Sequence, residues 1–309
     1  LGEYVAANAD TYNRVVIGAT ISTYTVSFNA NGADGTMTTL SGVLGVYELP
    51  VNEFTAPTGM NFKGWATTPD GSVISGSSIN VNENIVLYAI WEKVFDVWVG
   101  GVGMSDGDYL ANGASSTTTV APAEGGYAHY SAGVLTLSNY SYSGAGYMYD
   151  TANGLYAVIY SSVDIQVVLV GKNAVTQSQS YSSAIECESD ITISGEGSLD
   201  MEAEYAIEAF SGKLTVNNGV ISVLDSDYAF WCDYIVINGG KISINSYYNS
   251  IYADEDININ GGTLYIRSEF GTIGVLKGAI TINGGYIDAA SVGGFSTECT
   301  FTPAPSIDS

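Results

Sequence analysis

The chain has 309 residues, with 8 basic and 32 acidic side chains and a formal net charge of −24. So few lysines and arginines make binding to nucleic acid or to anionic membranes unexpected, because both depend on basic side chains that neutralise phosphate. The sequence also has no run of about 18 apolar residues, so we predict no membrane insertion; the composition suits a secreted protein that attracts cations.

The leading segment, residues 1–23, shows little pattern beyond an apolar run at 15–21. We expect it to form a single strand or to be the remnant of an upstream unit. Because the chain opens at Leu1 without a signal-peptide pattern, we expect a processed or trimmed chain.

Residues 24–92 carry three motifs in a fixed order. The motifs are Val26-Ser-Phe28-Asn-Ala-Asn-Gly32, Phe62-Lys-Gly-Trp65 and Leu87-Tyr-Ala-Ile-Trp91. Their large apolar side chains are sufficient for the core of a domain of about 70 residues. In type and order the motifs resemble the Listeria–Bacteroides repeat, the B-repeat of internalin-type surface proteins. That resemblance implies a small β-grasp domain, commonly a spacer, in a bacterial cell-surface protein.

Residues 93–132 are expected to link this domain to the next one and to cap it. Residues 97–101 alternate like an edge strand, whereas 105–126 are polar and glycine-rich and are expected to form a loop. The runs at 133–137 and 165–171 suggest irregular first coils of a repeat array, since terminal repeats are atypical. Residues 301–309 contain two prolines and are expected to form a tail.

One short phrase occurs five times between residues 184 and 290. Each copy alternates aliphatic and polar residues and ends on a glycine, as in Ile257-Asn-Ile-Asn-Gly-Gly262. The closing glycines are 22, 21, 22 and 23 residues apart: Gly197, Gly219, Gly240, Gly262 and Gly285. A fixed period of this length indicates repeats that stack on their neighbours.

Each repeat contains three short runs of period-two alternation, before, within and after the phrase, and no helical pattern. Three strands per repeat predict one coil of a parallel β-helix, and the chirality of parallel crossovers predicts a right-handed coil. The predicted fold is therefore mainly β: a small β-grasp domain followed by a right-handed single-stranded parallel β-helix over 133–300. A string of antiparallel hairpins is the competing interpretation, because Asn-Gly also favours hairpin turns.

The period also predicts which side chains stack from coil to coil. One inward aliphatic column would contain Leu199, Ile221, Ile242, Leu264 and Ile287. An asparagine ladder would contain Asn217, Asn238, Asn260 and Asn283, with Ser194 continuing it. Cys187 and Cys232 would share an inward column two coils apart, about 9.6 Å by stacking, which is too far for a disulfide.

A further column is expected to face outward. It contains Glu186, Glu208, Trp231, Tyr252 and Gly274. Glu186 and Glu208 would stack about 4.8 Å apart, which is unfavourable for like charges unless a cation or proton intervenes. Together with Glu204 of the preceding turn and Asp227 of the same turn one coil further on, they form a candidate metal site, with the oxygen ligands that calcium prefers. The alternative is a solvated acidic face.

Outward aromatic side chains are candidate carbohydrate-binding residues. Trp231 and Tyr252 would stack on adjacent coils, and Tyr265 faces outward elsewhere. Exposed rings favour sugar faces, and also protein partners. The alternative is that these rings only pack on one another and stabilise the coils.

Residues 150–290 also resemble, in phrases such as Ile257-Asn-Ile-Asn-Gly-Gly262, the acidic carbohydrate-binding β-helix proteins of anaerobic Firmicutes. The resemblance implies carbohydrate binding and calcium sites along the coils. The chain departs from that pattern because its Asp-rich turns are few, clear only at Asp225/Asp227 and Asp254/Asp256.

Catalysis is not expected. The only histidine, His129, is not accompanied by a nucleophile motif, and neither zinc-type Cys/His spacing nor a phosphate loop occurs. We therefore predict an extracellular bacterial adhesin-like protein, at the cell surface or secreted, whose β-helix binds a polysaccharide or a host or cell-wall glycan and which could also contact surface proteins. The alternatives are a polysaccharide lyase or hydrolase on the same scaffold and a purely structural surface stalk.

Overall fold

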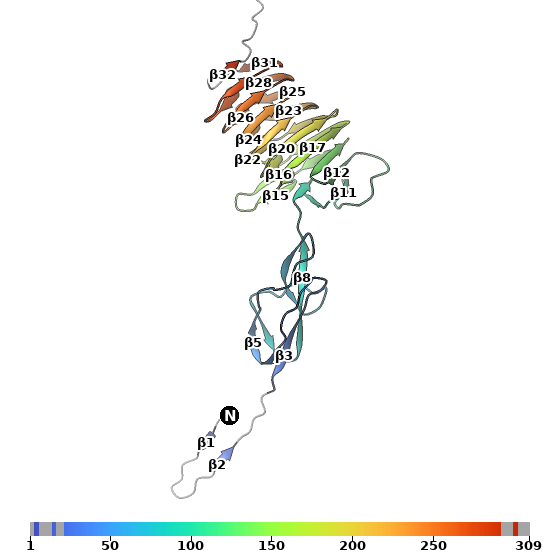
Figure 1. Cartoon of the computed structure of the whole chain (residues 1–309), viewed down its shortest axis with the longest axis vertical. Helices are drawn as coiled ribbons and strands as arrows, with labels where there is room; N and C mark the ends of the chain where they lie inside the picture. Colours follow the sequence, from blue (N-terminus) through green and yellow to red (C-terminus); the bar gives the residue numbers. More distant parts are fainter. Residues whose placement is uncertain (1–2, 6–13, 17–21, 292–298, 302–309) are drawn as a thin grey trace, which may run out of the picture. The chain divides into compact units, whose positions relative to one another are not determined.

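The computed structural model describes residues 3–5, 14–16, 22–291 and 299–301 (Figure 1). Contacts between residues divide the chain into two compact units, Leu1–Val94 and Phe95–Ser309. Among the described residues no helix is long and apolar enough to cross a membrane. The tail expected at 301–309 lies outside the described residues from 302 onward, as does most of the leading segment 1–23, where β1 (Glu3–Val5) pairs with β2 (Arg14–Val16).

The first unit is a small β domain. Its strands are β3 (Tyr24–Asn29), β4 (Leu40–Val43), β5 (Gly45–Glu48), β6 (Met60–Ala66), β7 (Ser78–Val81) and β8 (Ile85–Lys93). Four of them form a sheet in the order β4-β3-β8-β6, in which β3 and β8 run parallel, and β5 pairs with β7. Residues 22–94 contain no helix, so the β-grasp identity of this domain stays a prediction.

Trp65 lies at the centre of this domain's core, and its contacts explain why the sequence motifs occur in one domain. It is 3% exposed, and its ring lies 5.0 Å from Phe62 and 5.4 Å from Phe28. Gly64 beside it has a φ of +153°, and a Cβ there would lie 2.4 Å from a methyl carbon of Val73. The Phe-x-Gly-Trp motif therefore needs a glycine for space and for backbone conformation.

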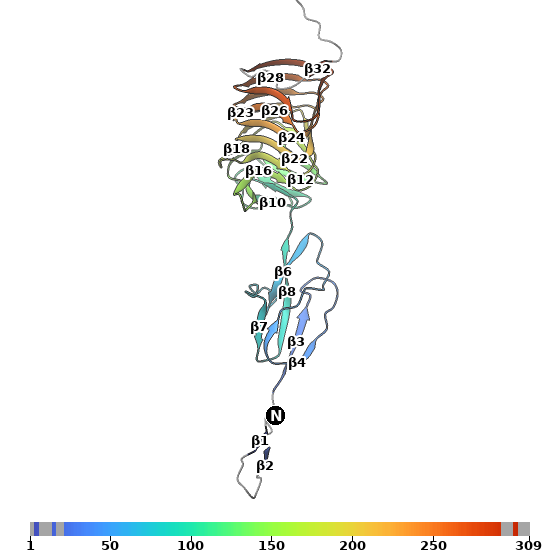
Figure 2. The ribbon, with the colours of Figure 1, turned by 90° about the vertical axis from the view of Figure 1, so that its left-hand side faces the viewer.

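The second unit is a β-solenoid whose coils each contribute one strand to each of three faces (Figure 2). Face 1 contains β13 (Val134–Ser138), β17 (Ile165–Val170), β20 (Ile191–Gly195), the second half of β22 (Tyr205–Val216), the second half of β24 (Tyr228–Ile237), β27 (Ile257–Ile259), β30 (Ile280–Ile282) and β32 (Cys299–Phe301). Face 2 contains β14 (Ser141–Gly144), β18 (Lys172–Gln177), β21 (Ser198–Glu202), β23 (Val220–Ser226), β25 (Lys241–Ser246), β28 (Thr263–Ser268) and β31 (Tyr286–Ser291). Face 3 contains β16 (Leu155–Ser161), β19 (Ser183–Cys187), the first halves of β22 and β24, β26 (Asn249–Ala253) and β29 (Gly271–Val275). All these neighbouring strands pair in parallel, so the competing hairpin arrangement is wrong; the right-handed sense stays a prediction.

The predicted inward column is confirmed. Leu199, Ile221, Ile242, Leu264 and Ile287 are successive partners across face 2. The first four are completely buried, whereas Ile287 on the last strand of the face is half-buried. The column belongs to one continuous hydrophobic core, which also contains the thiols of Cys187 and Cys232.

The asparagine ladder is also confirmed. Each side-chain amide donates to the side-chain oxygen of the previous coil: Asn238 to Asn217 at 2.9 Å, Asn260 to Asn238 at 2.9 Å and Asn283 to Asn260 at 2.7 Å. Ser194 takes a different partner, because its hydroxyl accepts a hydrogen bond from Gln166 at 3.2 Å.

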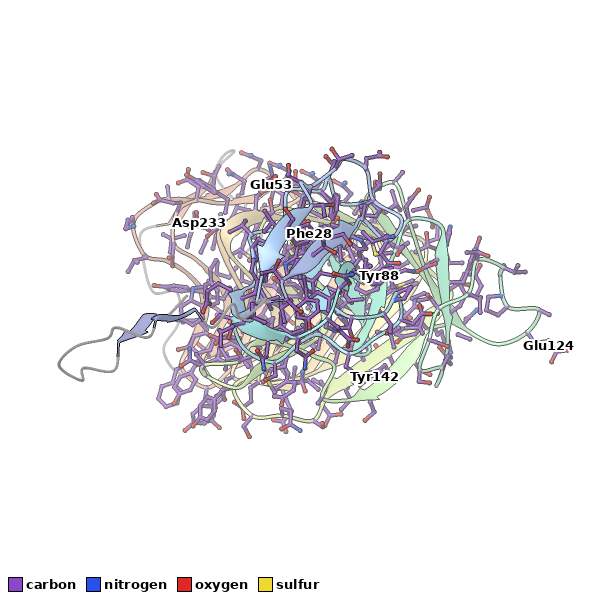
Figure 3. The ribbon with its side chains drawn as sticks, turned by 90° about the horizontal axis from the view of Figure 1, so that it is seen from below. Phe28, Glu53, Tyr88, Glu124, Tyr142 and Asp233 are labelled. Carbon is purple, nitrogen blue, oxygen red and sulfur yellow. The ribbon has the colours of Figure 1, made fainter. Side chains whose placement is uncertain are left out.

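Antiparallel strands precede the first coil. β9 (Val97–Val99) pairs with β10 (Val102–Met104) and with β16, and β12 (Tyr127–Ser131) pairs with β11 (Asp108–Ala111) and β13. The loop expected over 105–126 is therefore wrong at β11, where Leu110 is 1% exposed and joins the solenoid core. The rest of that segment includes Glu124, which lies on a loop that extends away from the strands (Figure 3).

Candidate functional site

The acidic and aromatic column of face 3 has the predicted register. Glu186 pairs with Glu208, Glu208 with Trp231, Trp231 with Tyr252, and Tyr252 with Gly274. Each lies beside an aliphatic or aromatic residue that points into the core, such as Ile207 next to Glu208. The alternation of the strand therefore places this column on the side opposite the core.

The expectation that Glu186 and Glu208 are exposed to solvent is wrong. Glu186 is 5% exposed and Glu208 is 4% exposed. The cause is β15 (Tyr147–Asp150), which pairs antiparallel with β16 beside them and carries Tyr149, whose hydroxyl shares a hydrogen bond with Ser183. Because β15 lies outside the repeated phrase, the period gave no sign that it would cover these positions.

Glu186 and Glu208 form a buried pair of carboxyl groups. Their side chains hydrogen-bond to each other, and the hydroxyl of Ser183 donates to Glu208 and lies 3.4 Å from an oxygen of Glu186. Burial raises the pKa of both carboxyl groups, and the negative charge of Glu208 raises the pKa of Glu186 further. Two carboxyl groups that interact this strongly retain a shared proton at a pH where isolated glutamates are ionised.

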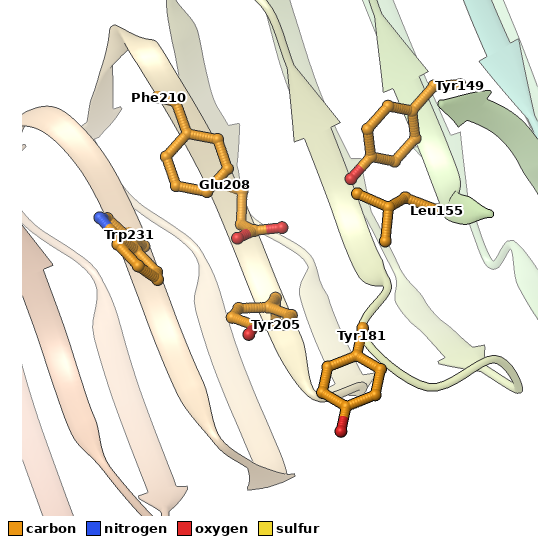
Figure 4. A pocket seen from close by; sticks show the side chains of 7 residues that line it. All are labelled: Tyr149, Leu155, Tyr181, Tyr205, Glu208, Phe210 and Trp231. Atoms are coloured by element: carbon orange, nitrogen blue, oxygen red, sulfur yellow. The ribbon is translucent and has the colours of Figure 1, made fainter. Parts of the chain in front are cut away.

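A pocket of about 180 Å³ opens beside this pair (Figure 4). Its walls are mostly aromatic. The lining residues are Tyr149, Leu155, Tyr181, Tyr205, Glu208, Phe210 and Trp231. Figure 4 shows the carboxyl group of Glu208 between Phe210 and Trp231 on one side and Tyr149 and Leu155 on the other. The pocket thus combines apolar rings with one acid and several phenol hydroxyls.

An aromatic row leads from this pocket along the solenoid. Tyr205 stacks on Tyr228 with ring centroids 5.8 Å apart, Tyr228 on Tyr248 at 5.4 Å, and Tyr248 on Phe270 at 5.6 Å. These rings lie where the face 3 strands of successive coils begin: Tyr205 and Tyr228 are the first residues of β22 and β24, and Tyr248 and Phe270 directly precede β26 and β29. We call Tyr205, Tyr228, Tyr248 and Phe270 the aromatic row.

Trp231 joins the pocket to the aromatic row. Its ring lies 5.1 Å from Phe210 in the pocket wall and 5.0 Å from Tyr228 in the row. Its indole nitrogen donates to Asp254 at 3.4 Å, and its ring meets Tyr252 edge-on at 5.9 Å. The structure therefore brings together the first two of the three aromatic residues that the sequence pointed to.

Tyr265 is separate from these residues. It lies on β28 of face 2, where its ring is 5.8 Å from Tyr286, and the ammonium group of Lys241 lies 5.7 Å from the Tyr265 ring centroid. The sequence already set Tyr265 apart from Trp231 and Tyr252, and the pairing of the strands places it on a different face.

The four candidate metal ligands fall into two pairs. Glu204 and Asp227 lie in the turns before the face 3 strands, where Glu204 accepts a hydrogen bond from the backbone of Tyr181 at 2.6 Å. Partial burial raises the pKa of Asp227, and the charge of Glu204 adds to that rise. Among the described residues no group of three or more His, Cys, Asp or Glu side chains could hold a metal ion, so calcium binding stays a prediction.

Sequence reasoning missed most of the pocket. Tyr205 and Tyr228 stand at the same place in successive repeats, two residues before Ile207 and Phe230, so a tabulation of the turn positions would have found them. Tyr149 and Leu155 belong to an irregular coil, and no repeat position predicts them.

These features define an all-β protein with a small β domain and a β-solenoid that carries an aromatic pocket on one face. Residues 24–90 match the Listeria–Bacteroides repeat domain, and residues 150–298 match the family described as carbohydrate-binding domain-containing protein. Both resemblances in the sequence are thereby confirmed, and the second match contains every pocket residue except Tyr149. Searches of the curated proteins and of the solved structures gave no match.

Proposed function

We propose that the solenoid binds carbohydrate without turning it over, and that the pocket at Glu208 and Trp231 is the binding site. The observation that carries the proposal is a concave, mostly aromatic pocket with a few polar groups, formed almost entirely by the segment that matches the carbohydrate-binding family. Aromatic rings pack against the C–H faces of sugars. Phenol hydroxyls and a carboxyl group can accept hydrogen bonds from sugar hydroxyls and donate hydrogen bonds to them.

The ligand is proposed to be a polysaccharide rather than a single sugar. A volume of about 180 Å³ suits one sugar residue, and the aromatic row continues from it through Trp231. The row's rings stack on one another, so their edges and hydroxyls are what they offer to a ligand. At its far end Phe270 is 55% exposed, which extends the contact surface over several coils.

Binding is favoured over hydrolysis by the geometry of the two acids. A glycosidase holds its two carboxyl groups about 5 to 9.5 Å apart, on either side of the scissile bond. Glu186 and Glu208 instead hydrogen-bond to each other. His129 is engaged in the cap, where it stacks on Tyr109 at 3.8 Å and its Nδ1 lies 3.0 Å from the carbonyl oxygen of Asp108.

The repeat domain supports a location outside the cell. Listeria–Bacteroides repeats are typical of bacterial surface proteins, and a domain of this kind before the solenoid suits a spacer that presents a binding unit. We therefore propose an adhesin-like role in which a cell-wall or host glycan is the partner.

An array of plant, host and bacterial glycans, probed with the whole chain, tests this proposal. We expect binding of at least one polysaccharide with no release of shortened or unsaturated products over prolonged incubation. Product release would replace the binding role with an enzymatic one. Absence of binding to every glycan on the array would favour a structural stalk.

A further inference from the structure

The pocket contains the carboxyl group of Glu208, and among the residues described as lining it no basic side chain offsets that charge. None of the described residues that line it is a lysine or arginine. Three basic side chains of the solenoid pair with acids elsewhere: Lys213 with Asp190 at 3.1 Å, Arg267 with Asp288 at 2.9 Å and Lys277 with Glu255 at 3.7 Å. Lys241 lies over Tyr265 on face 2.

The buried acid pair is the source of that charge. Burial raises the pKa of Glu208 to about 6, so above that pH Glu186 and Glu208 share one proton and carry one negative charge; both are less than a tenth exposed. The charge of Glu188 also acts on Glu186, so the electrostatic potential is negative around the pair. Burying an ionised carboxylate is costly unless a counter-charge accompanies it.

The rings around Glu208 suit the same kind of ligand. Phe210, Trp231, Tyr205 and Tyr181 line the pocket, and aromatic faces attract ammonium groups, tryptophan most strongly. A pocket that combines several rings with one desolvated carboxylate is selective for a cation that also has apolar surface. A neutral sugar would leave the carboxylate uncompensated, and an acidic sugar would be repelled.

We propose that the pocket binds a sugar residue that carries a protonated amino group, as in a polysaccharide of de-N-acetylated amino sugars. The ammonium group would lie against the carboxylate of Glu208 while the sugar ring packs on Trp231 and Phe210. This inference rests on the proposed function and specifies its ligand.

The test compares glucosamine oligomers with N-acetylglucosamine oligomers of the same length, at pH 6.5, by calorimetry with the whole chain. We expect the free-amine oligomers to bind at least about tenfold more tightly, as one charge-assisted hydrogen bond provides. The double variant Glu186→Gln/Glu208→Gln should remove this preference, because either acid alone could still supply the charge.

The matched control is Asp200→Asn/Glu202→Gln. It replaces two carboxyl groups with amides at two exposed positions of β21 on face 2 and removes more negative charge than the pocket variant does, yet it should keep the preference. Equal loss in both double variants would mean that general attraction to an acidic protein, and not the pocket, selects amines.

The outcomes separate the inference from the function on which it rests. If another glycan of the array binds while free-amine oligomers bind no tighter than acetylated ones, the inference falls and carbohydrate binding stands. If no glycan binds, both fall. A competition experiment with the wild-type protein tests whether the sugar matters. If choline at equal concentration displaces the oligomer, the site accepts alkylammonium groups in general, and the assignment to an amino sugar is overturned.

Discussion

The Glu186→Gln variant is expected to make the stability of the solenoid less dependent on pH. Burial and the charge of Glu208 raise the pKa of Glu186, so the folded protein holds a proton that the unfolded chain has released. Stability is then greatest below the ordinary glutamate pKa and falls as the pH rises toward the raised value. Each retained proton changes the free energy of unfolding by about 1.4 kcal/mol per pH unit.

Between pH 6 and pH 8 this effect amounts to a loss of about 3 kcal/mol in the wild type if the proton is held throughout. Glutamine keeps a hydrogen-bond donor toward Glu208 but cannot ionise, so the loss should shrink. The other titratable groups that interact electrostatically with the pair are Tyr149, Tyr160, Cys187, Glu188, Tyr205 and Cys232. The tyrosines and cysteines do not ionise in this range, because burial raises their pKa values.

Urea unfolding at pH 6, 7 and 8, followed by circular dichroism, measures the effect. Glu202→Gln is the control, because Glu202 is exposed on face 2. A wild-type stability that does not fall between pH 6 and 8, or a Glu202→Gln variant that flattens the profile as much as Glu186→Gln, would refute the reasoning.

Three further predictions concern the coils and the two units. Ile242→Ala should lower the free energy of unfolding by about 2–5 kcal/mol, because it empties a fully buried site, and Ile287→Ala in the half-buried last position should cost clearly less; equal costs in urea unfolding would contradict the column. Asn260→Ala removes two ladder hydrogen bonds and Asn283→Ala removes one, so thermal melts should show the larger decrease for the first, and the reverse order would argue against the ladder. Limited proteolysis near residues 93–96 should release a solenoid that keeps its own cooperative melt, whereas loss of all structure after cleavage would indicate one shared core.

The register of the solenoid could be predicted from the sequence because the repeat fixes it physically. A phrase that recurs every 21 to 23 residues places identical side chains one above another, so a single correct alignment assigns every column. The aliphatic column through Ile242 and the ladder through Asn260 follow from that alone. The motifs of the first domain could be recognised for a similar reason, since a Cβ at the glycine beside Trp65 would clash with the side chain of Val73.

The site was predicted only in part, because its decisive features come from outside the repeat. Period-two alternation distinguishes inward from outward, but it does not reveal that β15 covers the outward acids Glu186 and Glu208. It did separate Tyr265 from Trp231, because the two residues follow different parts of the repeat, but it did not show which outward rings border a pocket. The strand β11 was missed because it lies in a polar, glycine-rich stretch, in which Leu110 is the one buried hydrophobic residue that the structure describes.

The most direct test of the account is the affinity of four proteins for the glycan that binds most strongly on the array. Wild type is compared with Trp231→Ala and with Tyr265→Ala, and Phe210→Ala serves as a second pocket variant because its side chain is 46% exposed and contributes little to the core. We predict that both pocket variants lose about tenfold or more in affinity while their melts stay cooperative, and that Tyr265→Ala binds like wild type. Full affinity in both pocket variants together with loss in Tyr265→Ala would place the ligand on face 2 and contradict the account.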